Sequence, residues 1–267
     1  MNLAGKRILL TGATGGLGNT LAKQLTTKGA NLAILGRDSL KLKNLKNDIQ
    51  DSGNKVISIE ADLSQKGITE KAINETIEKL GGIDVVINNA GVLDFIAFEN
   101  QSEERIQEII HTNVTAVIQL SHAAMPYFKK NNAGHLVFIG SIFGSLGFPY
   151  YATYCASKFA IHGFSQALRR ELVSTNIGIT YVAPRFIKTA MNNEAATAMT
   201  KKSGNKMDSP EKVAALVLQG LEQEKQEVFI GQPETFFSWL NGVAPKLVNL
   251  GLKKQTLLAQ SFLDHNQ

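Results

Sequence analysis

Short runs of apolar residues alternate with longer amphipathic stretches along most of the chain. In one of the longer stretches, Leu17, Leu21 and Leu25 recur at the spacing of a single helix face. The short runs have the length and β-branched content of strands, and we expect strands at residues 7–10, 32–35, 56–59, 85–87, 136–139, 179–182 and 227–230. Strands that alternate with helices form parallel sheets covered on both faces. The pattern therefore predicts an α/β protein with a Rossmann-type, doubly wound parallel sheet of about seven strands.

The pattern changes toward the C-terminus. Residues 189–206 are rich in Ala, Thr, Asn and Lys, lack strand character and are expected to form a flap. Farther on, Phe236, Phe237, Leu240 and Val243 recur at a spacing that one buried helix face explains. We expect a single cofactor-binding and catalytic domain over residues 1–232 and a helical extension over 233–267, packed on that domain or at a subunit interface. Peripheral contact of this extension with a membrane is the less favoured alternative.

Composition narrows the classes of function. The chain has 267 residues, of which 43% are hydrophobic and 19% charged, as is typical of a packed globular protein. Its net charge of +5 attracts anions weakly, but no nucleic-acid recognition motif accompanies the charge, so no nucleic-acid partner is expected. The absence of a secretion signal and of a long apolar run favours a soluble cytoplasmic protein. The single cysteine, Cys155, and the scattered histidines form no ligand pattern, so no metal is expected.

A glycine-rich segment, TGATGGLG, follows the first expected strand and opens the first expected helix. A dinucleotide needs close approach of the backbone at this position, and glycine has no Cβ to obstruct it. Free amides at the start of the helix then point at the pyrophosphate. A glycine-rich turn without a ligand is the alternative. The residues assigned here to cofactor binding are Gly12, Thr14, Gly15, Gly16, Leu17 and Gly18.

The end of the second expected strand bears on the choice of cofactor. Dinucleotide folds that prefer NAD place a carboxylate there on the ribose, whereas an arginine accommodates the 2′-phosphate of NADP. Gly36 stands where the carboxylate is expected, and Asp38 comes too late to point at the ribose. Arg37 can pair with the phosphate, so NADP(H) is the preferred cofactor and NAD(H) stays an alternative. The competing interpretation makes Arg37 an ordinary surface charge.

Several separated motifs share one chain in a characteristic order: TGATGGLG at 11–18, Asp-Leu at 62–63, NNAG at 88–91, YCASK at 154–158, and Pro184 with Thr189. With these motifs, residues 5–231 resemble the short-chain dehydrogenase/reductase (SDR) family. The resemblance implies a catalytic tetrad of Asn113, Ser141, Tyr154 and Lys158. It also implies that the cofactor is bordered by Asp62, Leu63, Asn88, Ala90, Gly91, Tyr154, Lys158, Pro184, Ile187 and Thr189. By resemblance alone, the protein is expected to form a homodimer or homotetramer.

Tyr154 and Lys158 are also connected by their spacing. Residues four apart share one helix face, so the ammonium group is expected beside the phenol and is expected to lower the pKa of Tyr154. In reduction, Tyr154 would donate a proton to a carbonyl oxygen while the cofactor delivers a hydride, with Ser141 bonding the same oxygen. The resemblance adds a water, ordered by Asn113, that connects Lys158 to solvent. Taken singly, each of these side chains also suits an ordinary surface, capping or packing role.

One residue departs from the family pattern. Many members have glycine directly after the proline that ends the sixth strand, whereas this chain has Arg185. We expect its side chain to face either an anionic group of the substrate or solvent. Apolar residues around the expected site predict a largely apolar substrate pocket, formed by Leu93, Phe95, Phe143, Phe148, Tyr150, Tyr151 and Met191.

The sequence thus predicts an NADP(H)-dependent oxidoreductase that interconverts a small carbonyl compound and its alcohol, with Tyr154 as general acid and base. The alternative is a nucleotide-binding regulatory protein of the same fold without significant turnover. A sugar-nucleotide epimerase ranks last, because it usually needs a larger substrate-binding extension. The identity of the substrate is left open, because this fold supports many substrates.

Overall fold

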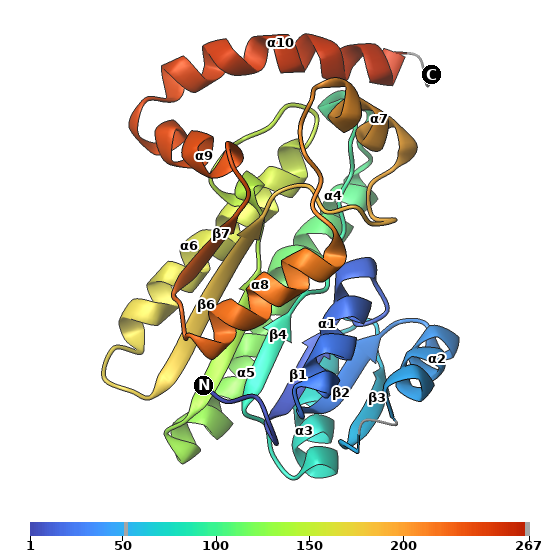
Figure 1. Ribbon diagram of the computed structural model, residues 1–267, viewed down its shortest axis with the longest axis vertical. Coiled ribbons are helices and arrows are strands. Elements are labelled where there is room, and N and C mark those ends of the chain that lie inside the picture. The colour runs from blue at the N-terminus through green and yellow to red at the C-terminus, as the bar shows by residue number, and fades with distance from the viewer. Residues whose placement is uncertain (51–52, 265–267) are drawn as a thin grey trace.

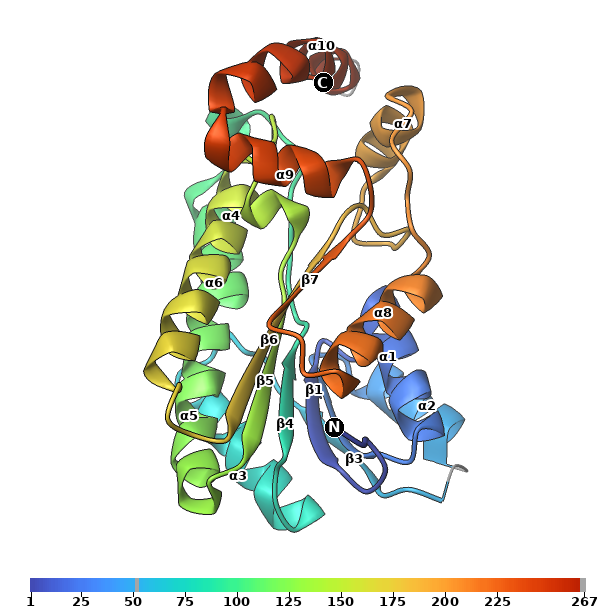
Figure 2. The same cartoon turned by 60° about the vertical axis from the view of Figure 1, so that its left-hand side comes forward.

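A computed structural model of the protein describes residues 1–50 and 53–264, so residues 265–267 of the expected extension lie outside it. Its centre is a seven-stranded sheet in the order β3-β2-β1-β4-β5-β6-β7, with every neighbouring pair parallel (Figure 1, Figure 2). The strands are β1 (Arg7–Thr11), β2 (Asn31–Gly36), β3 (Val56–Glu60), β4 (Val85–Asn88), β5 (Gly134–Ile139), β6 (Ile177–Pro184) and β7 (Glu227–Ile230). The predicted doubly wound fold and all seven expected strands are confirmed.

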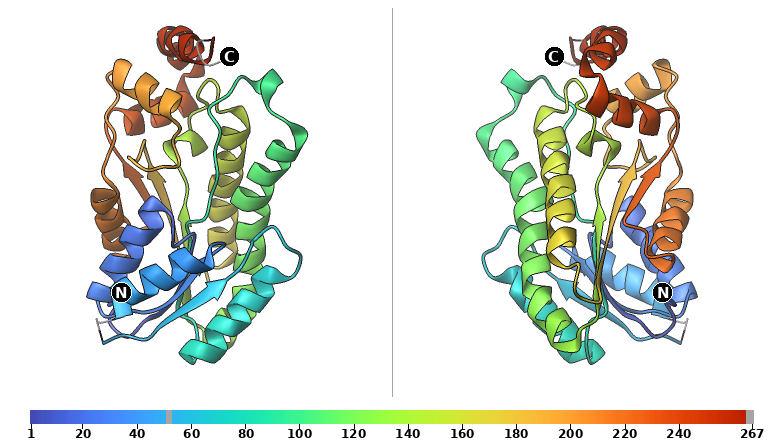
Figure 3. Two further views of the ribbon diagram at one scale, coloured as in Figure 1. Left: turned by 90° about the vertical axis from the view of Figure 1, so that its right-hand side faces the viewer. Right: turned by 90° about the vertical axis from the view of Figure 1, so that its left-hand side faces the viewer.

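Helices cover both faces of this sheet (Figure 3). One face carries α1 (Gly16–Thr27), α2 (Ser39–Ile49) and α8 (Pro210–Glu222), whose apolar sides share one core with the strands. The other face carries α3 (Ile68–Leu80), α5 (Ala116–Asn131) and α6 (Ala152–Glu171) over a second core. Strands covered on both faces are apolar at nearly every position, which explains why they appear in the sequence as continuous runs.

Polar side chains cap the starts of several helices. Asp38 accepts a hydrogen bond from the backbone N–H of Lys41 at the start of α2. The Ser102 side chain accepts a hydrogen bond from the backbone N–H of Arg105 at the start of α4 (Glu103–Ile110). The Ser209 side chain, directly before Pro210, accepts one from the backbone N–H of Lys212 at the start of α8. Each such cap contributes about 1 kcal/mol of helix stability. These helix starts are therefore encoded locally in the sequence.

Segments from the last third of the chain cover the carboxyl ends of the strands (Figure 1, Figure 2). They are α7 (Glu194–Lys202), α9 (Glu234–Val243) and α10 (Pro245–Asp264). Ala196 and Met199 of α7 pack with Ala259 of α10, and all three side chains are fully buried. The expected flap at 189–206 thus contains a packed helix. Since parallel strands all end at the same edge, the loops that follow them converge beneath these helices.

Candidate active site

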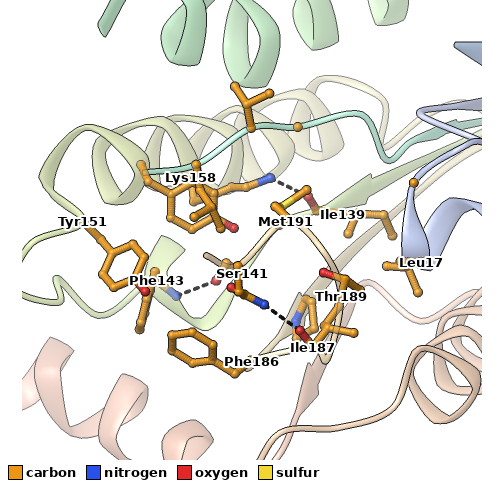
Figure 4. Close-up of a pocket in the computed structure, with 18 of the residues that line it drawn as sticks. Leu17, Ile139, Ser141, Phe143, Tyr151, Lys158, Phe186, Ile187, Thr189 and Met191 are labelled. Carbon is orange, nitrogen blue, oxygen red and sulfur yellow. Dashed lines mark hydrogen bonds between the residues drawn. The ribbon is translucent and has the colours of Figure 1, made fainter. Parts of the chain in front are cut away.

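A cavity of about 780 Å³ lies at the carboxyl edge of the sheet (Figure 4). One end is lined by the loop between β1 and α1, together with the ends of β2 and β3. The other end is lined by aromatic side chains and by parts of α9 and α10. Expected site residues from both halves of the sequence therefore share one cavity.

The loop between β1 and α1 has no room for side chains at two of its glycines. Gly12 has φ of +62°, and a Cβ there would lie 2.8 Å from the Cα of Ala90. A Cβ on Gly18 would clash with the carbonyl oxygen of Gly12, which is rigid backbone. The space that a side chain would need at these two glycines is taken by neighbouring atoms of the protein. All six residues assigned to cofactor binding in this segment line the cavity, and their contact with a cofactor stays a prediction.

Asn89 locks this loop to the end of β4. Its Nδ2 donates to the carbonyl oxygens of Thr11, at 2.9 Å, and Gly12, at 3.1 Å. In return, the Thr11 hydroxyl accepts hydrogen bonds from the backbone N–H groups of Asn89 and Ala90, both at 3.0 Å. The loop is thereby held by four hydrogen bonds that do not depend on a ligand.

The placement of Asn88 in the cofactor cavity is wrong. Asn88 is the last residue of β4, is 3% exposed and does not line the cavity, whereas Asn89, Ala90 and Gly91 do. Its amide nitrogen and oxygen have no hydrogen-bond partner among the described residues. Successive side chains point to opposite sides at a strand end, so only one of two adjacent asparagines can face the loop. The sequence analysis did not identify Asn89, although this alternation could have indicated it.

The ends of β2 and β3 contribute charged groups. Arg37 is 65% exposed, lines the cavity and has a long ion pair of 3.8 Å with Glu108. The carboxylate of Asp38 caps α2, and the hydrogen bond from the Lys41 backbone holds its pKa below the usual value. A backbone hydrogen bond from Ser64 likewise lowers the pKa of Asp62. Asp62 and Leu63 both line the cavity, as expected.

Tyr154 and Lys158 lie one turn apart on α6, as their spacing predicts. The Lys158 Nζ is 5.6 Å from the centre of the Tyr154 ring. It donates a hydrogen bond of 2.9 Å to the carbonyl oxygen of Ile139, at the end of β5 (Figure 4). Lys158 is only 6% exposed, and this burial lowers the pKa of its ammonium group to about 8. A buried cation is thus held at the centre of the cavity.

The lowered pKa expected for Tyr154 depends on Lys158 together with an oxidised nicotinamide and stays a prediction, whereas the protein alone shows the opposite direction. Burial raises the pKa of the phenol well above its ordinary value, and only a hydrogen bond with Ser141 opposes that rise. The free-energy cost of removing the Tyr154 phenolate from water exceeds the stabilisation that Lys158 provides, because the Lys158 ammonium group is directed at the Ile139 carbonyl. Tyr154 is therefore protonated at neutral pH.

Ser141 is positioned by its neighbours beside Tyr154. Its hydroxyl accepts a hydrogen bond from the backbone N–H of Phe143, at 3.1 Å, in the short helical turn Ile142–Gly144. Its carbonyl oxygen accepts a 3.2 Å hydrogen bond from the hydroxyl of Tyr181, which is fully buried in β6. Both Ser141 and Tyr154 line the cavity.

Asn113 lies behind the cavity wall, in the π-helical turn His111–Thr115 between α4 and α5. Its Oδ1 accepts from the backbone N–H of Val92 at 2.9 Å, and its Nδ2 donates to the Val92 carbonyl at 2.8 Å. Nδ2 also donates to the Ser157 hydroxyl at 3.0 Å. The amide of Asn113 therefore ties the loop after β4 to α6. Its expected role in ordering a water stays a prediction.

The segment after β6 closes the cavity over the glycine loop. Pro184, Ile187 and Thr189 all line the cavity, and the contact with the cofactor that the family resemblance implies for them stays a prediction. The Thr189 side chain packs so closely on Gly16 that a Cβ there would lie 2.7 Å from it. Ile187 forms a bridge with Asp208, which holds the segment in an extended conformation.

Arg185 lines the cavity, but its guanidinium is paired with carboxylates of the protein and is not left free for an anionic ligand. Its Nε donates to Asp208 at 2.8 Å, and its Nη1 donates to Glu234 at 3.1 Å and to the Gln232 carbonyl at 2.9 Å. The side chain is only 7% exposed and is neutralised by two carboxylates. Its aliphatic part packs against Gly231, where a Cβ would clash. Gly231, which has no side chain, therefore leaves the space that Arg185 fills. Through its ion pairs with Asp208 and Glu234, Arg185 connects the end of β6 to the starts of α8 and α9.

The apolar end of the cavity is an aromatic wall beside Tyr154. The Phe143 and Phe148 rings stack at 4.9 Å, and the Phe186 ring meets Phe143 edge-on at 5.8 Å. Leu93, Phe143, Phe148, Tyr151 and Met191 line the cavity as expected, but Phe95 and Tyr150 pack behind the wall. The sequence analysis missed Phe186 and the lining residues contributed by the last two helices, which are Phe237, Leu247, Val248 and Leu252.

Two other residues of this wall carry polar atoms. Cys155 is buried as expected, and burial raises the pKa of its thiol to about 11. The Tyr151 hydroxyl is buried without a hydrogen-bond partner in the described part of the chain. Among residues 1–50 and 53–264, no group of three or more His, Cys, Asp or Glu side chains is placed to hold a metal ion.

The fold and the cavity agree with a known family. The family model for short chain dehydrogenases matches residues 6–200. The chain belongs to the short-chain dehydrogenase/reductase family. As an SDR, it is a member of a family of oxidoreductases. Ketoacyl reductase HetN from Nostoc sp. is 31% identical over 231 residues, which cover 86% of this chain and 80% of that protein.

Solved SDR structures resemble the chain over most of its length. A short-chain type dehydrogenase/reductase from Mycobacterium marinum matches with a TM-score of 0.81 and 28% identity, over 88% of this chain and 97% of that one. A short chain dehydrogenase/reductase from Burkholderia phymatum, solved in complex with NAD, matches with a TM-score of 0.83 and 21% identity. That alignment covers 92% of this chain and 96% of the other, and it shows a shared fold.

Proposed function

We propose that the protein is an NADP(H)-dependent reductase of an apolar ketone or aldehyde, with Tyr154 as its proton donor. The observation that carries this proposal is the convergence of Tyr154, Ser141 and Lys158 on one cavity whose other end is a glycine loop without room for side chains. Membership of an oxidoreductase family supports it. Tyr154 is half-buried, and its neighbours leave it protonated, which suits donation of a proton to a carbonyl oxygen.

The residues of the cavity fit a nicotinamide dinucleotide. When bound, such a cofactor would supply the hydride. The start of α1 and the loop before it would hold the pyrophosphate, because free amides and the helix dipole favour a negative group there. Lys158 would hold the adjoining ribose, and Thr189 together with Ile187 would border the nicotinamide. The Burkholderia phymatum SDR, solved with NAD, has the same fold.

The charges at the end of β2 support NADP over NAD. Arg37 is exposed and held only by a 3.8 Å ion pair, so its guanidinium is available to a phosphate. Asp38 is occupied by its helix cap and does not offer a carboxylate to a ribose. Lys41 lines the same part of the cavity and adds positive charge.

Within the proposed reaction, each polar residue has a separate task. Tyr154 donates the proton to the carbonyl oxygen, and Ser141 donates a hydrogen bond to the same oxygen as negative charge develops on it. Lys158 stays protonated below a pKa of about 8 and stabilises the phenolate left on Tyr154. The aromatic wall excludes water and orients an apolar substrate, a class with which the name of the Nostoc ketoacyl reductase is compatible.

Binding and turnover test this proposal separately. Titration with NADPH and NADH, followed by nicotinamide fluorescence, should show preference for NADPH, and Arg37→Ala should remove that preference. Arg170→Ala, which changes an exposed arginine on α6 outside the cavity, is the matched control and should leave it intact. Equal affinity for both cofactors in the unchanged protein would contradict the NADP assignment.

Turnover is measured as NADPH consumption with a series of apolar ketones and aldehydes. Tyr154→Phe should lower kcat/KM by about 100-fold or more at unchanged NADPH affinity, because a general acid contributes at least that factor. Tyr127→Phe, which removes a hydroxyl on α5 away from the cavity, should leave the rate unchanged. Tight NADPH binding without any turnover would instead favour a regulatory nucleotide-binding protein.

A further inference from the structure

The last two helices expose a large number of apolar side chains. The spacing of Phe236, Phe237, Leu240 and Val243 predicted one buried helix face, and that prediction is wrong. Only Leu240 is partly buried, while the other three are between 42% and 67% exposed. Trp239 is 61% exposed beside them. The face that packs inward is instead formed by smaller side chains, including Ser238 in α9 and Val248 in α10.

These side chains form one patch along each helix. In α9, Phe236, Trp239 and Val243 follow one another at intervals of three and four, and the rings of Phe236 and Trp239 lie 5.9 Å apart. In α10, Leu250 and Leu257 are about two helical turns apart, and their side chains are 74% and 61% exposed. We call the exposed residues Phe236, Phe237, Trp239, Val243, Leu247, Leu250 and Leu257 the hairpin patch.

The helices that carry the hairpin patch, α9 and α10, lie at the outer end of the molecule, beyond the carboxyl edge of the sheet (Figure 1, Figure 2). Scattered exposed apolar residues are ordinary, but seven on two consecutive helices are a concentration of the kind that marks an interaction site. No described helix is long and apolar enough to cross a bilayer, so any contact with lipid here would be peripheral.

The charges along the hairpin patch are mainly positive, because the two acidic residues of α9 and α10 stand at the ends of the helix pair: Glu234, which pairs with Arg185, and Asp264. Between residues 235 and 263 the chain contains Lys246, Lys253 and Lys254 and no Asp or Glu. All three lysines are exposed on α10, among the leucines of the patch. An amphipathic helix whose exposed apolar residues alternate with lysines, and whose one acidic residue is at its C-terminal end, has the chemistry that binds the surface of an anionic bilayer.

We propose that the hairpin patch docks the protein on the surface of a membrane that contains anionic lipid. A second copy of this chain suits the patch less well, because a two-fold contact would bring the same lysines from both copies together. The proposal stands independently of the proposed reductase activity. The two connect at one point: Phe237 and Leu247 of the patch also line the cavity, so docking would place the cavity beside the lipid phase.

Trp239 is the only tryptophan of the chain and lies within the patch, so its fluorescence reports directly on docking. The purified full-length protein is mixed with vesicles of phosphatidylcholine alone or with 30% phosphatidylglycerol. We expect the anionic vesicles to shift the Trp239 emission to shorter wavelength and to sediment the protein, and 0.5 M salt to weaken both effects. Neutral vesicles should bind at least tenfold more weakly.

Matched variants distinguish binding through the hairpin patch from non-specific binding to vesicles. Leu250→Ser should weaken binding to the anionic vesicles at least fivefold, whereas Leu40→Ser, a similarly exposed leucine on α2, should not. The double variant Lys253→Gln/Lys254→Gln should also weaken binding to the anionic vesicles at least fivefold. Its control is Lys129→Gln/Lys130→Gln, which changes an exposed adjacent pair of lysines on α5 and should not weaken binding. Unchanged circular dichroism in each variant establishes that the fold is intact.

Three results would overturn the proposal. The first is an emission spectrum and a sedimentation profile that do not respond to anionic vesicles. The second is equal loss of binding in the patch variants and their controls. The third is a dimer that forms without vesicles, buries Trp239 and is broken by Leu250→Ser, since the patch would then belong to a subunit interface. None of these results depends on whether NADPH binds or turns over.

Discussion

The two ends of the cavity are built in different ways. At the glycine-loop end, four hydrogen bonds link Thr11 and Gly12 to residues 89–90, and backbone atoms fill the space that a side chain would need. At the aromatic end, Phe143, Phe148 and Phe186 pack through their rings, and the helices beyond them contribute apolar side chains. One end is therefore determined by backbone geometry and the other by side-chain packing.

This difference bears on what each end can bind. Hydrogen bonds that join the Thr11 and Asn89 side chains to backbone groups fix the loop closely, which suits a cofactor whose pyrophosphate does not vary. Apolar packing depends on volume and shape, and residues of similar volume can replace one another there at modest cost. The aromatic end is the part of the cavity in which a change of sequence can change the substrate while the fold persists.

The largest expected effect is that of adding one methyl group at the glycine-loop end. Gly18→Ala should lower the free energy of unfolding by about 3 kcal/mol or more and abolish NADPH binding, because the new Cβ meets the rigid carbonyl of Gly12. Gly242→Ala, at an exposed position of α9 outside the cavity lining, is the control: its Cβ meets no atom within 4 Å, and it should raise stability by up to about 1 kcal/mol through its better helix propensity. Urea unfolding of both variants measures the contrast, and similar effects of the two substitutions would contradict the close packing at Gly18.

Lys158, between the two ends, is expected to reduce stability at neutral pH. Burial lowers the pKa of its ammonium group from 10.5 to about 8, which corresponds to a cost of about 3 kcal/mol for the buried charge. Lys158→Met also leaves the Ile139 carbonyl without its partner, at a cost of about 1 kcal/mol. The variant should therefore be about 2 kcal/mol more stable at pH 7.

The pH dependence of this difference gives the check. Between pH 8 and 10.5 the unfolded chain binds a proton that the folded protein has lost, so the stability of the unchanged protein rises with pH relative to the variant. The advantage of Lys158→Met should shrink by about 2 kcal/mol between pH 7 and 9.5, as measured by urea unfolding at each pH. An advantage that is absent at pH 7, or that grows with pH, would contradict a depressed lysine pKa.

The smallest expected effects compare two buried tyrosines. The Tyr181 hydroxyl hydrogen-bonds the backbone of Ser141, so Tyr181→Phe should lower stability by about 1 kcal/mol. The Tyr151 hydroxyl, in the aromatic wall, has no partner among the described residues, so Tyr151→Phe should raise stability by about 1 kcal/mol. Thermal unfolding resolves the two signs, and a loss of stability in both variants would mean that Tyr151 has a polar partner after all.

Local signals in the sequence determined much of this protein. The strands are continuous apolar runs because both faces of the sheet are covered, and the caps at Asp38, Ser102 and Ser209 set helix starts. The separation of Tyr154 from Lys158 was sufficient to place both on one side of α6. Each of these features depends on residues close together in the chain, so a repeating pattern was enough to predict it.

Features that depend on residues far apart were decided by the tertiary structure alone. Arg185 pairs with Asp208 and Glu234 in space left by Gly231, and no local pattern indicates that arrangement. The raised pKa of Tyr154 follows from its partial burial in the packed chain, and spacing along a helix does not give the extent of that burial. Helical spacing likewise showed that α9 has an apolar face, but whether another part of the chain covers that face is a property of the whole fold.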